Sequence, residues 1–190
     1  MFRSAIKRAV GLMAAGLLFV ACGDGGVEAE FVVDGDVATM TGDIGSSTPD
    51  EVRALLEDHP NVSTLVLVDV PGSMDDVANL EASRLVRSAG LATHVPSDGV
   101  IASGGVDFFL AGAIRTWDEG AMFGVHSWTD GETEGADLPE DDEGHDLFLD
   151  YYDEMNVDPG FYWFTLDAAP AADIHYMTDD ELDRYGFATP

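Results

Sequence analysis

The sequence predicts an α/β fold for the part of the chain that follows residue 29. Three observations support this prediction. Short apolar runs rich in β-branched residues alternate with segments of helical periodicity, helix-start signals precede those segments, and the connections between them are short.

The first elements follow this pattern. Residues 31–33 and 37–41 flank an Asp-Gly-Asp turn at 34–36, which predicts a β-hairpin. Residues 48–51 have the spacing of a capping box, with a proline at the first helical position, so a helix is expected to begin there. The continuous apolar run at 65–68 is typical of a buried parallel strand.

The middle of the chain continues the alternation. A Pro-Gly-Ser turn at 71–73 separates that strand from a helix at 75–89, which Gly90 closes. Further strands are expected at 91–95, 100–102 and 122–125, with a helix of small and apolar residues at 104–113.

The last third contains an acidic loop and more helices. Residues 129–146 are acidic and lack a hydrophobic period, which predicts an exposed loop. Helices are expected at 147–155, at 161–166 and after a second capping box at 178–181. Carboxylates suit hard cations, so a calcium site in the loop is an alternative, but the EF-hand spacing is missing. We expect no metal and no cofactor.

The N-terminal residues predict export. Basic residues at positions 3, 7 and 8 precede an uncharged run of 13 residues, 9–21, which is typical of a signal peptide (residues 1–21) and too short to span a bilayer. Residues 19–22 (Phe-Val-Ala-Cys) resemble a bacterial lipobox, which implies a lipid on Cys22. The alternative is a plain secretory signal followed by an incidental cysteine.

Lipidation would attach the mature protein to a membrane of the bacterial cell envelope, facing the periplasm or the exterior. The glycine-rich residues 22–29 would form a flexible tether, and residues 30–190 a single domain. Cys22 is the only cysteine, so an intramolecular disulfide is excluded.

The charge distribution excludes some classes of function. The net charge is −29, and from residue 22 onward five arginines and no lysine stand against 37 acidic residues. Nucleic-acid binding requires clustered Lys and Arg and is therefore excluded. Because 46% of the residues are hydrophobic, a disordered acidic chain is disfavoured. The excess of acidic residues is explained more simply by a solvated surface than by substrate selection. Such a surface could be an adaptation to high salt.

Three positions could carry chemistry. The turn at Gly72 could offer backbone amides to an anion. Ser103 lies at a strand-to-helix junction, where a helix-capping role is the common alternative. His126 ends an apolar strand, where the alternative is a hydrogen-bonded core histidine. Each signal is weak alone, but their order is informative.

In this order, the Gly72 turn, Ser103 and His126 resemble the ClpP-like peptidases of the ClpP/crotonase superfamily. Residues 42–44, 109–115 and 124–127 resemble an exported bacterial subgroup of these proteins, and residues 176–186 look like the closing helix of the family. The resemblance implies repeated β-β-α units around a mostly parallel sheet, and assembly into homo-oligomers.

The resemblance also implies site residues. Ser103 would be the nucleophile, His126 its general base, and the amides of Gly72 and Gly104 the oxyanion hole. The sequence departs from the family pattern at two places: Ser73 stands where a glycine is usual, and Gly104-Gly105 replaces the Ala-Cys of the exported subgroup.

The third member of the triad is not fixed by the sequence. The orienting aspartate of the family aligns near Pro170, and Asp167 and Asp173 lie three residues to either side. Asp173 is slightly preferred, and Asp167 remains an alternative.

The resulting hypothesis is a lipid-anchored, exported serine hydrolase of peptidase type, acting on a peptide or on a small neutral or cationic substrate. The alternative is a catalytically inactive ClpP-like binding module on the cell envelope, which the missing aspartate favours. Acyl-CoA chemistry, as in the crotonase branch, is disfavoured because a mature chain with five arginines and no lysine is poorly equipped to bind the CoA phosphates.

Overall fold

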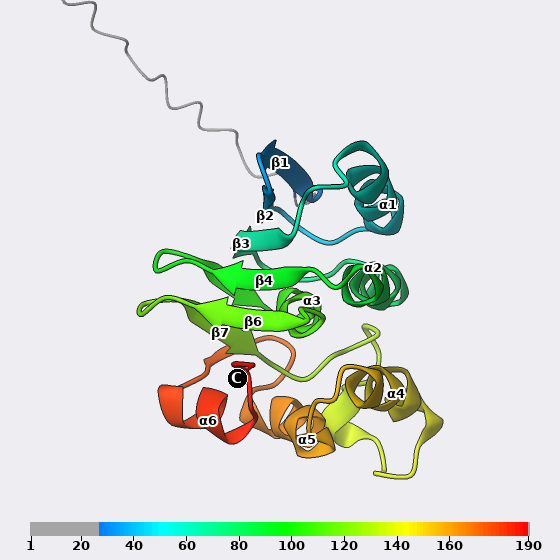
Figure 1. Ribbon diagram of the computed structural model, residues 1–190. Coiled ribbons are helices and arrows are strands. Elements are labelled where there is room, and N and C mark those ends of the chain that lie inside the picture. Colours follow the sequence, from blue (N-terminus) through cyan, green and yellow to red (C-terminus); the bar gives the residue numbers. More distant parts are fainter. Residues whose placement is uncertain (1–26, 190) are drawn as a thin grey trace, which may run out of the picture.

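Eight strands form one mostly parallel sheet in residues 27–189, the part of the chain that the computed structural model describes (Figure 1). The predicted signal peptide, Cys22 and most of the predicted tether lie outside the described residues. The strands are β1 Glu30–Asp34, β2 Val37–Thr41, β3 Thr64–Val70, β4 Ala92–Val95, β5 Val100–Ala102, β6 Ile114–Trp117, β7 Met122–Val125 and β8 His175–Tyr176.

Helices cover the sheet and close its lower end in Figure 1. They are α1 Thr48–Asp58, α2 Asp76–Ala89, α3 Gly104–Leu110, α4 Asp146–Glu154, α5 Pro159–Ala168 and α6 Asp179–Arg184, with 3-10 turns η1 Gly135–Asp137 and η2 Glu143–His145. In the described part of the chain, none of the helices is long and apolar enough to cross a membrane.

Strand β3 is the branch point of the sheet. One of its edges pairs with β2. On the other edge, residues 64–66 pair with β4, whereas residues 69–70 pair with β5. The sheet therefore divides into an arm of β4 and β6 and an arm of β5, β7 and β8. The pairs among β3, β4, β5, β6 and β7 are parallel. Among the eight strands, only β1–β2 and β7–β8 pair in antiparallel fashion.

The described N-terminal residues pack on the sheet. The amide of Ala29 donates to the carbonyl of Asp43 at 2.9 Å, and the amide of Asp43 donates to Val27 at 2.7 Å. Gly42 permits this approach, because it has φ of 98° and a Cβ there would lie 2.6 Å from the carbonyl oxygens of residues 27 and 28.

The C-terminal segment is tied to the sheet by a buried arginine. The Arg115 guanidinium on β6 donates to the carbonyls of Leu110, Gly186 and Phe187. Phe187 in turn packs against Phe109 and Phe123, with ring centroids 6.1 and 5.6 Å apart. Burial lowers the pKa of Arg115, while its hydrogen bonds to carbonyls satisfy the charged group.

The predicted α/β class is confirmed, together with the hairpin, the Gly90 helix stop and the capping box at Thr178. The sequence prediction missed β6 and β8, and the predicted helix 104–113 ends at Leu110. In β6 the usual pattern is inverted, because Ile114 is exposed and Arg115 is buried. Helix α1 is preceded by Ser47 as N-cap, so the capping box expected at residue 48 does not form.

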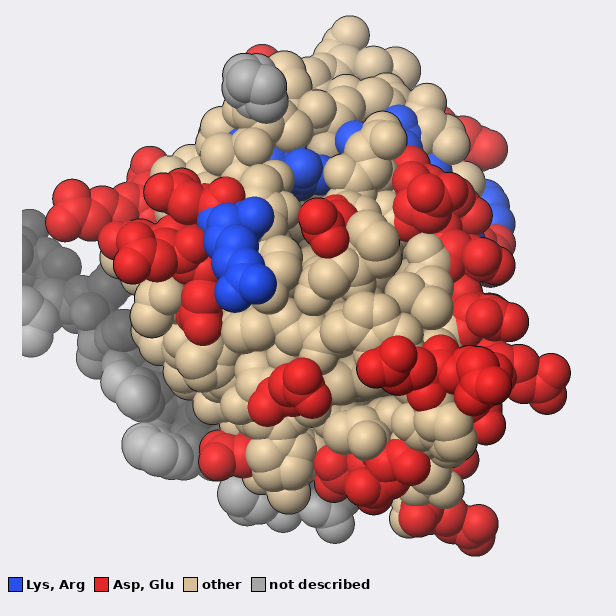
Figure 2. All heavy atoms as spheres, turned by 90° about the horizontal axis from the view of Figure 1, so that it is seen from below, with Lys and Arg blue, Asp and Glu red and all other residues tan. Residues whose placement is uncertain are grey.

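Acidic side chains outnumber basic ones on the face that carries α4, α5 and α6. Figure 2 shows carboxylates spread over this face and few basic side chains among them. The acidic segment 129–146 folds as a loop with the turns η1 and η2 and leads into α4. Its described residues form no group of three or more side chains that could hold a metal ion.

Candidate active site

The carboxyl ends of three neighbouring parallel strands bring the predicted residues to one edge of the sheet. The turn at Gly72 and Ser73 follows β3, Ser103 follows β5, and His126 follows β7. Val70 pairs with Ile101, and Ala102 pairs with Gly124. Ligands of parallel α/β sheets commonly bind at this edge, beyond the carboxyl ends of the strands.

Ser103 has a backbone conformation that residues with side chains rarely adopt. Its φ is 50° and its ψ is −128°. Its amide donates to the Gly124 carbonyl at 2.9 Å, and its own carbonyl accepts from Val106 at 2.8 Å, so both neighbouring elements hold it. Such strain costs on the order of 1–3 kcal/mol and is concentrated at functional sites.

The hydroxyl of Ser103 does not cap helix α3. Ser103 occupies the N-cap position, but its side chain makes no capping hydrogen bond. It lines a cavity of about 230 Å³ instead. A strained strand-to-helix turn that exposes a serine hydroxyl is the local geometry by which α/β hydrolases present their nucleophile.

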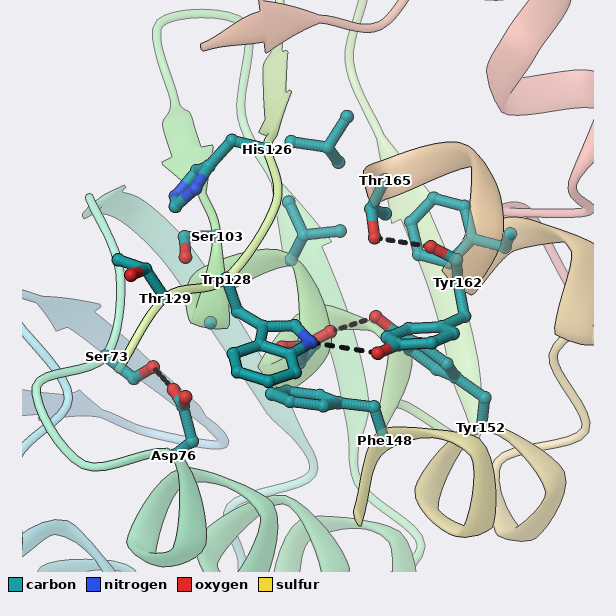
Figure 3. Close-up of a pocket in the computed structure, with 15 residues that line it drawn as sticks. Ser73, Asp76, Ser103, His126, Trp128, Thr129, Phe148, Tyr152, Tyr162 and Thr165 are labelled. Atoms are coloured by element: carbon teal, nitrogen blue, oxygen red, sulfur yellow. Dashed lines mark hydrogen bonds between the residues drawn. The ribbon is translucent and has the colours of Figure 1, made fainter. Parts of the chain in front are cut away.

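His126 lines the same cavity. Figure 3 shows His126 beside Ser103 at one end of it, with Trp128, Phe148, Tyr152 and Tyr162 toward the other. His126 Nδ1 lies 2.7 Å from the carbonyl oxygen of Ser127. A carbonyl only accepts, so Nδ1 carries a proton in this geometry, and in the neutral imidazole Nε2 then has the lone pair. Within residues 27–189 no hydrogen bond joins His126 to Ser103, and such bonds often tighten only when substrate binds.

Three backbone amides near Ser103 lack a hydrogen-bond acceptor in the described part of the chain. The amides of Gly72, Ser73 and Gly104 donate to no protein group in the described structure. A Cβ on Gly72 would lie 3.3 Å from Ser103 Cβ, so the Gly72 backbone runs directly alongside the serine. Asn79 on α2 holds the Gly104 peptide by donating to its carbonyl at 3.0 Å. Sequence reasoning did not single out Asn79.

Ser73 and Gly104-Gly105, the two departures from the family pattern, meet at the turn that follows β3. Ser73 has no positive φ, so this turn does not need the freedom of a glycine. Its hydroxyl donates to Asp76. A Cβ at Gly104 would overlap the Ser73 side chain, and one at Gly105 would overlap the Val70 carbonyl oxygen. The glycines therefore allow α3 to pack directly on the turn after β3.

The predicted third member of the triad forms no hydrogen bond or ion pair with His126 in the described part of the chain. Asp173 is exposed, and its Oδ1 accepts from the amide of Ile174 at 2.9 Å. Asp167 is exposed on α5. The assignment of either carboxylate to the triad stays a prediction.

A buried carboxyl, Asp107, also lines the cavity, and sequence reasoning missed it. It lies one helical turn after Ser103 on α3 and is 7% exposed. The Tyr152 hydroxyl donates to Oδ1 at 2.6 Å. Burial raises the pKa of Asp107 to about 7; the Tyr152 hydrogen bond lowers this pKa, and the nearby charge of Asp76 raises it. Asp107 is the only charged residue between positions 100 and 113, which is the signal that could have identified it.

Comparison with known proteins identifies the fold. No family model matches the sequence, and no curated protein matches it. A serine-to-alanine mutant of the 1510-N membrane-bound stomatin-specific protease superimposes with a TM-score of 0.54 at 15% identity, covering 80% of this chain and 76% of that chain. A lysine-to-alanine mutant of the same protease, in complex with a substrate peptide, gives a TM-score of 0.51 at 15% identity, covering 80% and 72%.

A protein from Streptomyces coelicolor A3(2), assigned as an enoyl-CoA hydratase, gives a TM-score of 0.52 at 18% identity, covering 93% of this chain and 71% of that chain. The chain has a ClpP/crotonase-like fold. At these identities the likeness concerns the fold alone. Because one fold here carries both a protease and a hydratase, the residues of the site must decide the function.

The Asp107 carboxyl predicts a pH-dependent stability. Its pKa is raised from 3.8 to about 7 on folding, so the folded state binds this proton more tightly than the unfolded state. This contribution to the free energy of unfolding is full below pH 4, falls as pH rises toward 7, and is lost above it. The loss is about 4 kcal/mol as an upper bound. Asp107→Asn removes this titration. Urea unfolding of the mature chain at pH 5 and pH 8 should therefore show that the free energy of unfolding of the variant, relative to wild type, is higher at pH 8 than at pH 5.

The exposed Asp167→Asn is the matched control and should follow wild type at both pH values. If the difference between Asp107→Asn and wild type is the same at pH 5 and pH 8, the raised pKa of Asp107 is wrong.

Proposed function

We propose that this chain is an exported, lipid-anchored serine hydrolase of peptidase type, with Ser103 as nucleophile and His126 as general base. The observation that carries the proposal is the strained turn at Ser103. It leaves the hydroxyl uncapped, in a cavity that His126 also lines. A fold shared with a serine protease is compatible with this activity.

The chemistry would proceed through an acyl-enzyme. His126 Nε2 takes the Ser103 proton while Oγ bonds to the substrate carbonyl carbon, and the carbonyl oxygen becomes an oxyanion that the amides of Gly72 and Gly104 stabilise. His126 then gives its proton to the leaving group as the bond to it breaks. A water molecule, activated by the same histidine, hydrolyses the ester and restores Ser103.

The Ser127 carbonyl would orient the imidazole. It accepts from Nδ1 at 2.7 Å and so directs the free lone pair of Nε2. A neutral carbonyl stabilises an imidazolium less than a carboxylate does, so a slower reaction than that of a complete triad is expected. Asp173 and, second, Asp167 remain the candidates if a carboxylate takes this role. Residues 27–189 contain no lysine that could act as the base instead.

The second candidate is the inactive binding module, which the absence of a carboxylate against His126 in the described residues favours. Acyl-CoA chemistry is disfavoured by the cavity. Asp76 and Asp107 line it and no arginine does, whereas a CoA thioester brings phosphates that need cations.

Covalent labelling tests the nucleophile. A fluorophosphonate probe should label the mature chain, and Ser103→Ala should abolish the label because the bond forms at Oγ. Ser73→Ala and Ser127→Ala should keep it, since the Ser73 hydroxyl donates to Asp76 and the buried Ser127 hydroxyl accepts from Ala136. Gel fluorescence and mass spectrometry read the label. If folded wild type does not react, the binding module replaces the hydrolase.

The same assay separates the two ways of orienting His126. With the Ser127 carbonyl as the partner, Asp173→Asn and Asp167→Asn should each label within about threefold of the wild-type rate, while His126→Ala should be slower by orders of magnitude. If either asparagine variant labels more slowly by about 10⁴, that aspartate completes a triad and the carbonyl assignment is wrong.

Lipidation is tested at Cys22. The basic start, the apolar run and the Ala21-Cys22 junction predict that metabolic labelling with a fatty acid marks wild type and not Cys22→Ala. Equal labelling of both proteins, or of neither, would remove the lipid anchor from the proposal and leave the hydrolase site untouched.

A further inference from the structure

The aromatic end of the cavity holds a carboxylate with a free oxygen. Asp107 is more than nine-tenths buried, and its Oδ1 accepts from Tyr152. Within residues 27–189, Oδ2 accepts no hydrogen bond, although Asp107 lines the cavity. The Tyr151 hydroxyl donates to the Asp107 backbone carbonyl at 2.6 Å, so two tyrosines of α4 fix this residue in place.

The polar atoms of the surrounding Trp128 and Tyr162 are engaged with each other and with His145. Trp128 Nε1 donates to the Tyr162 hydroxyl at 2.8 Å, and that hydroxyl lies 2.6 Å from His145 Nδ1. Phe148 stacks against both Trp128 and Tyr162, at centroid distances of 6.1 and 5.8 Å. Figure 3 shows these rings grouped together in the pocket. The polar atoms of Trp128 and Tyr162 are thus occupied, and aromatic faces attract cations.

The cavity carries negative charge without a cation of its own. Asp76 lines it together with Asp107, and none of its lining residues is an arginine. The described arginines are engaged elsewhere: Arg53 and Arg84 pair with carboxylates, and Arg87 and Arg115 bind backbone carbonyls, while Arg184 lies over Tyr185.

A neutral apolar substrate group would leave the buried carboxylate of Asp107 unpaired, and an unpaired buried charge is unfavourable. A cation that donates to Oδ2 would pair it. At about 230 Å³, the cavity is below the size range of drug-sized ligand sites and suits a single side chain.

We propose that the part of the cavity formed by Asp107, Trp128, Phe148, Tyr152 and Tyr162, the Asp107 pocket, selects a positively charged substrate group such as an ammonium or guanidinium side chain. This inference rests on the proposed function, because it names the substrate class of the same site. Asp107 would be its specificity-determining residue, with Oδ2 accepting from the cation and the rings covering its apolar stem.

Equilibrium binding tests the Asp107 pocket without relying on catalysis. Benzylammonium and benzyl alcohol have similar shapes and differ in charge. Isothermal titration of the mature chain at pH 8, in 0.5 M salt to screen the acidic surface, should show the ammonium binding about tenfold or more tightly than the alcohol. Asp107→Asn keeps an acceptor for Tyr152 and should bring this ratio close to one.

The exposed Asp58→Asn, on α1 and outside the residues that line the cavity, changes the net charge equally and should keep the wild-type ratio. Equal affinity for both ligands in wild type overturns the inference, whether or not the variant folds. A preference that survives Asp107→Asn overturns it as well.

Labelling of Ser103 separates this result from the proposed function. If the probe labels wild type and no charge preference exists, the pocket assignment alone is wrong. If an Asp107-dependent preference exists and no serine reacts, the hydrolase is wrong and the chain binds cations as an inactive module. Benzylammonium should also slow labelling of Ser103, and the alcohol at the same concentration should not.

Discussion

The parallel register of β3, β5 and β7 is the constraint on which the site depends. The Ser103 amide donates a hydrogen bond to the Gly124 carbonyl. His126 follows Gly124 by two residues, so the alternation of a strand directs both residues to the same face. A slip of one residue in β7 would turn the His126 side chain to the opposite face. The Gly72 backbone lies against Ser103, and Gly105 lies against the Val70 carbonyl, so α3 packs directly on the end of β3 and the turn that follows it.

Two unfavourable features meet at the cavity that this register creates. Ser103 holds a positive φ, and Asp107 is a carboxyl whose burial raises its pKa to about 7 and so costs stability at neutral pH. Glycine would relax the backbone at position 103, and asparagine at position 107 would remove the buried charge while keeping an acceptor for Tyr152. Violations of local rules that coincide in one cavity are characteristic of functional sites, where geometry and charge take precedence over stability.

The sequence predicted what is local. The hairpin, the helix stop at Gly90 and the capping box at Thr178 depend on neighbouring residues and could be derived from them. Strand β6 was missed because Arg115 faces inward, which requires carbonyls from residues 110, 186 and 187 that no local pattern shows. Asp107 and Asn79 were missed because their roles arise from α4 and from the peptide of Gly104. Whether a carboxylate reaches His126 depends on where the chain beyond the acidic loop returns to β7, which is equally a long-range question.

Charge connects substrate selection to the chemistry. The reaction proposed for Ser103 must develop an oxyanion in a cavity that already holds Asp107 one helical turn away, and two negative charges in a partly buried site repel each other. A cationic group bound to Asp107 neutralises the first charge before the second develops, so it would favour the transition state beyond its contribution to binding. A neutral substrate would face either an unpaired carboxylate or the need to protonate it. The same carboxyl that costs the fold stability would thus make the site respond to the charge of its substrate.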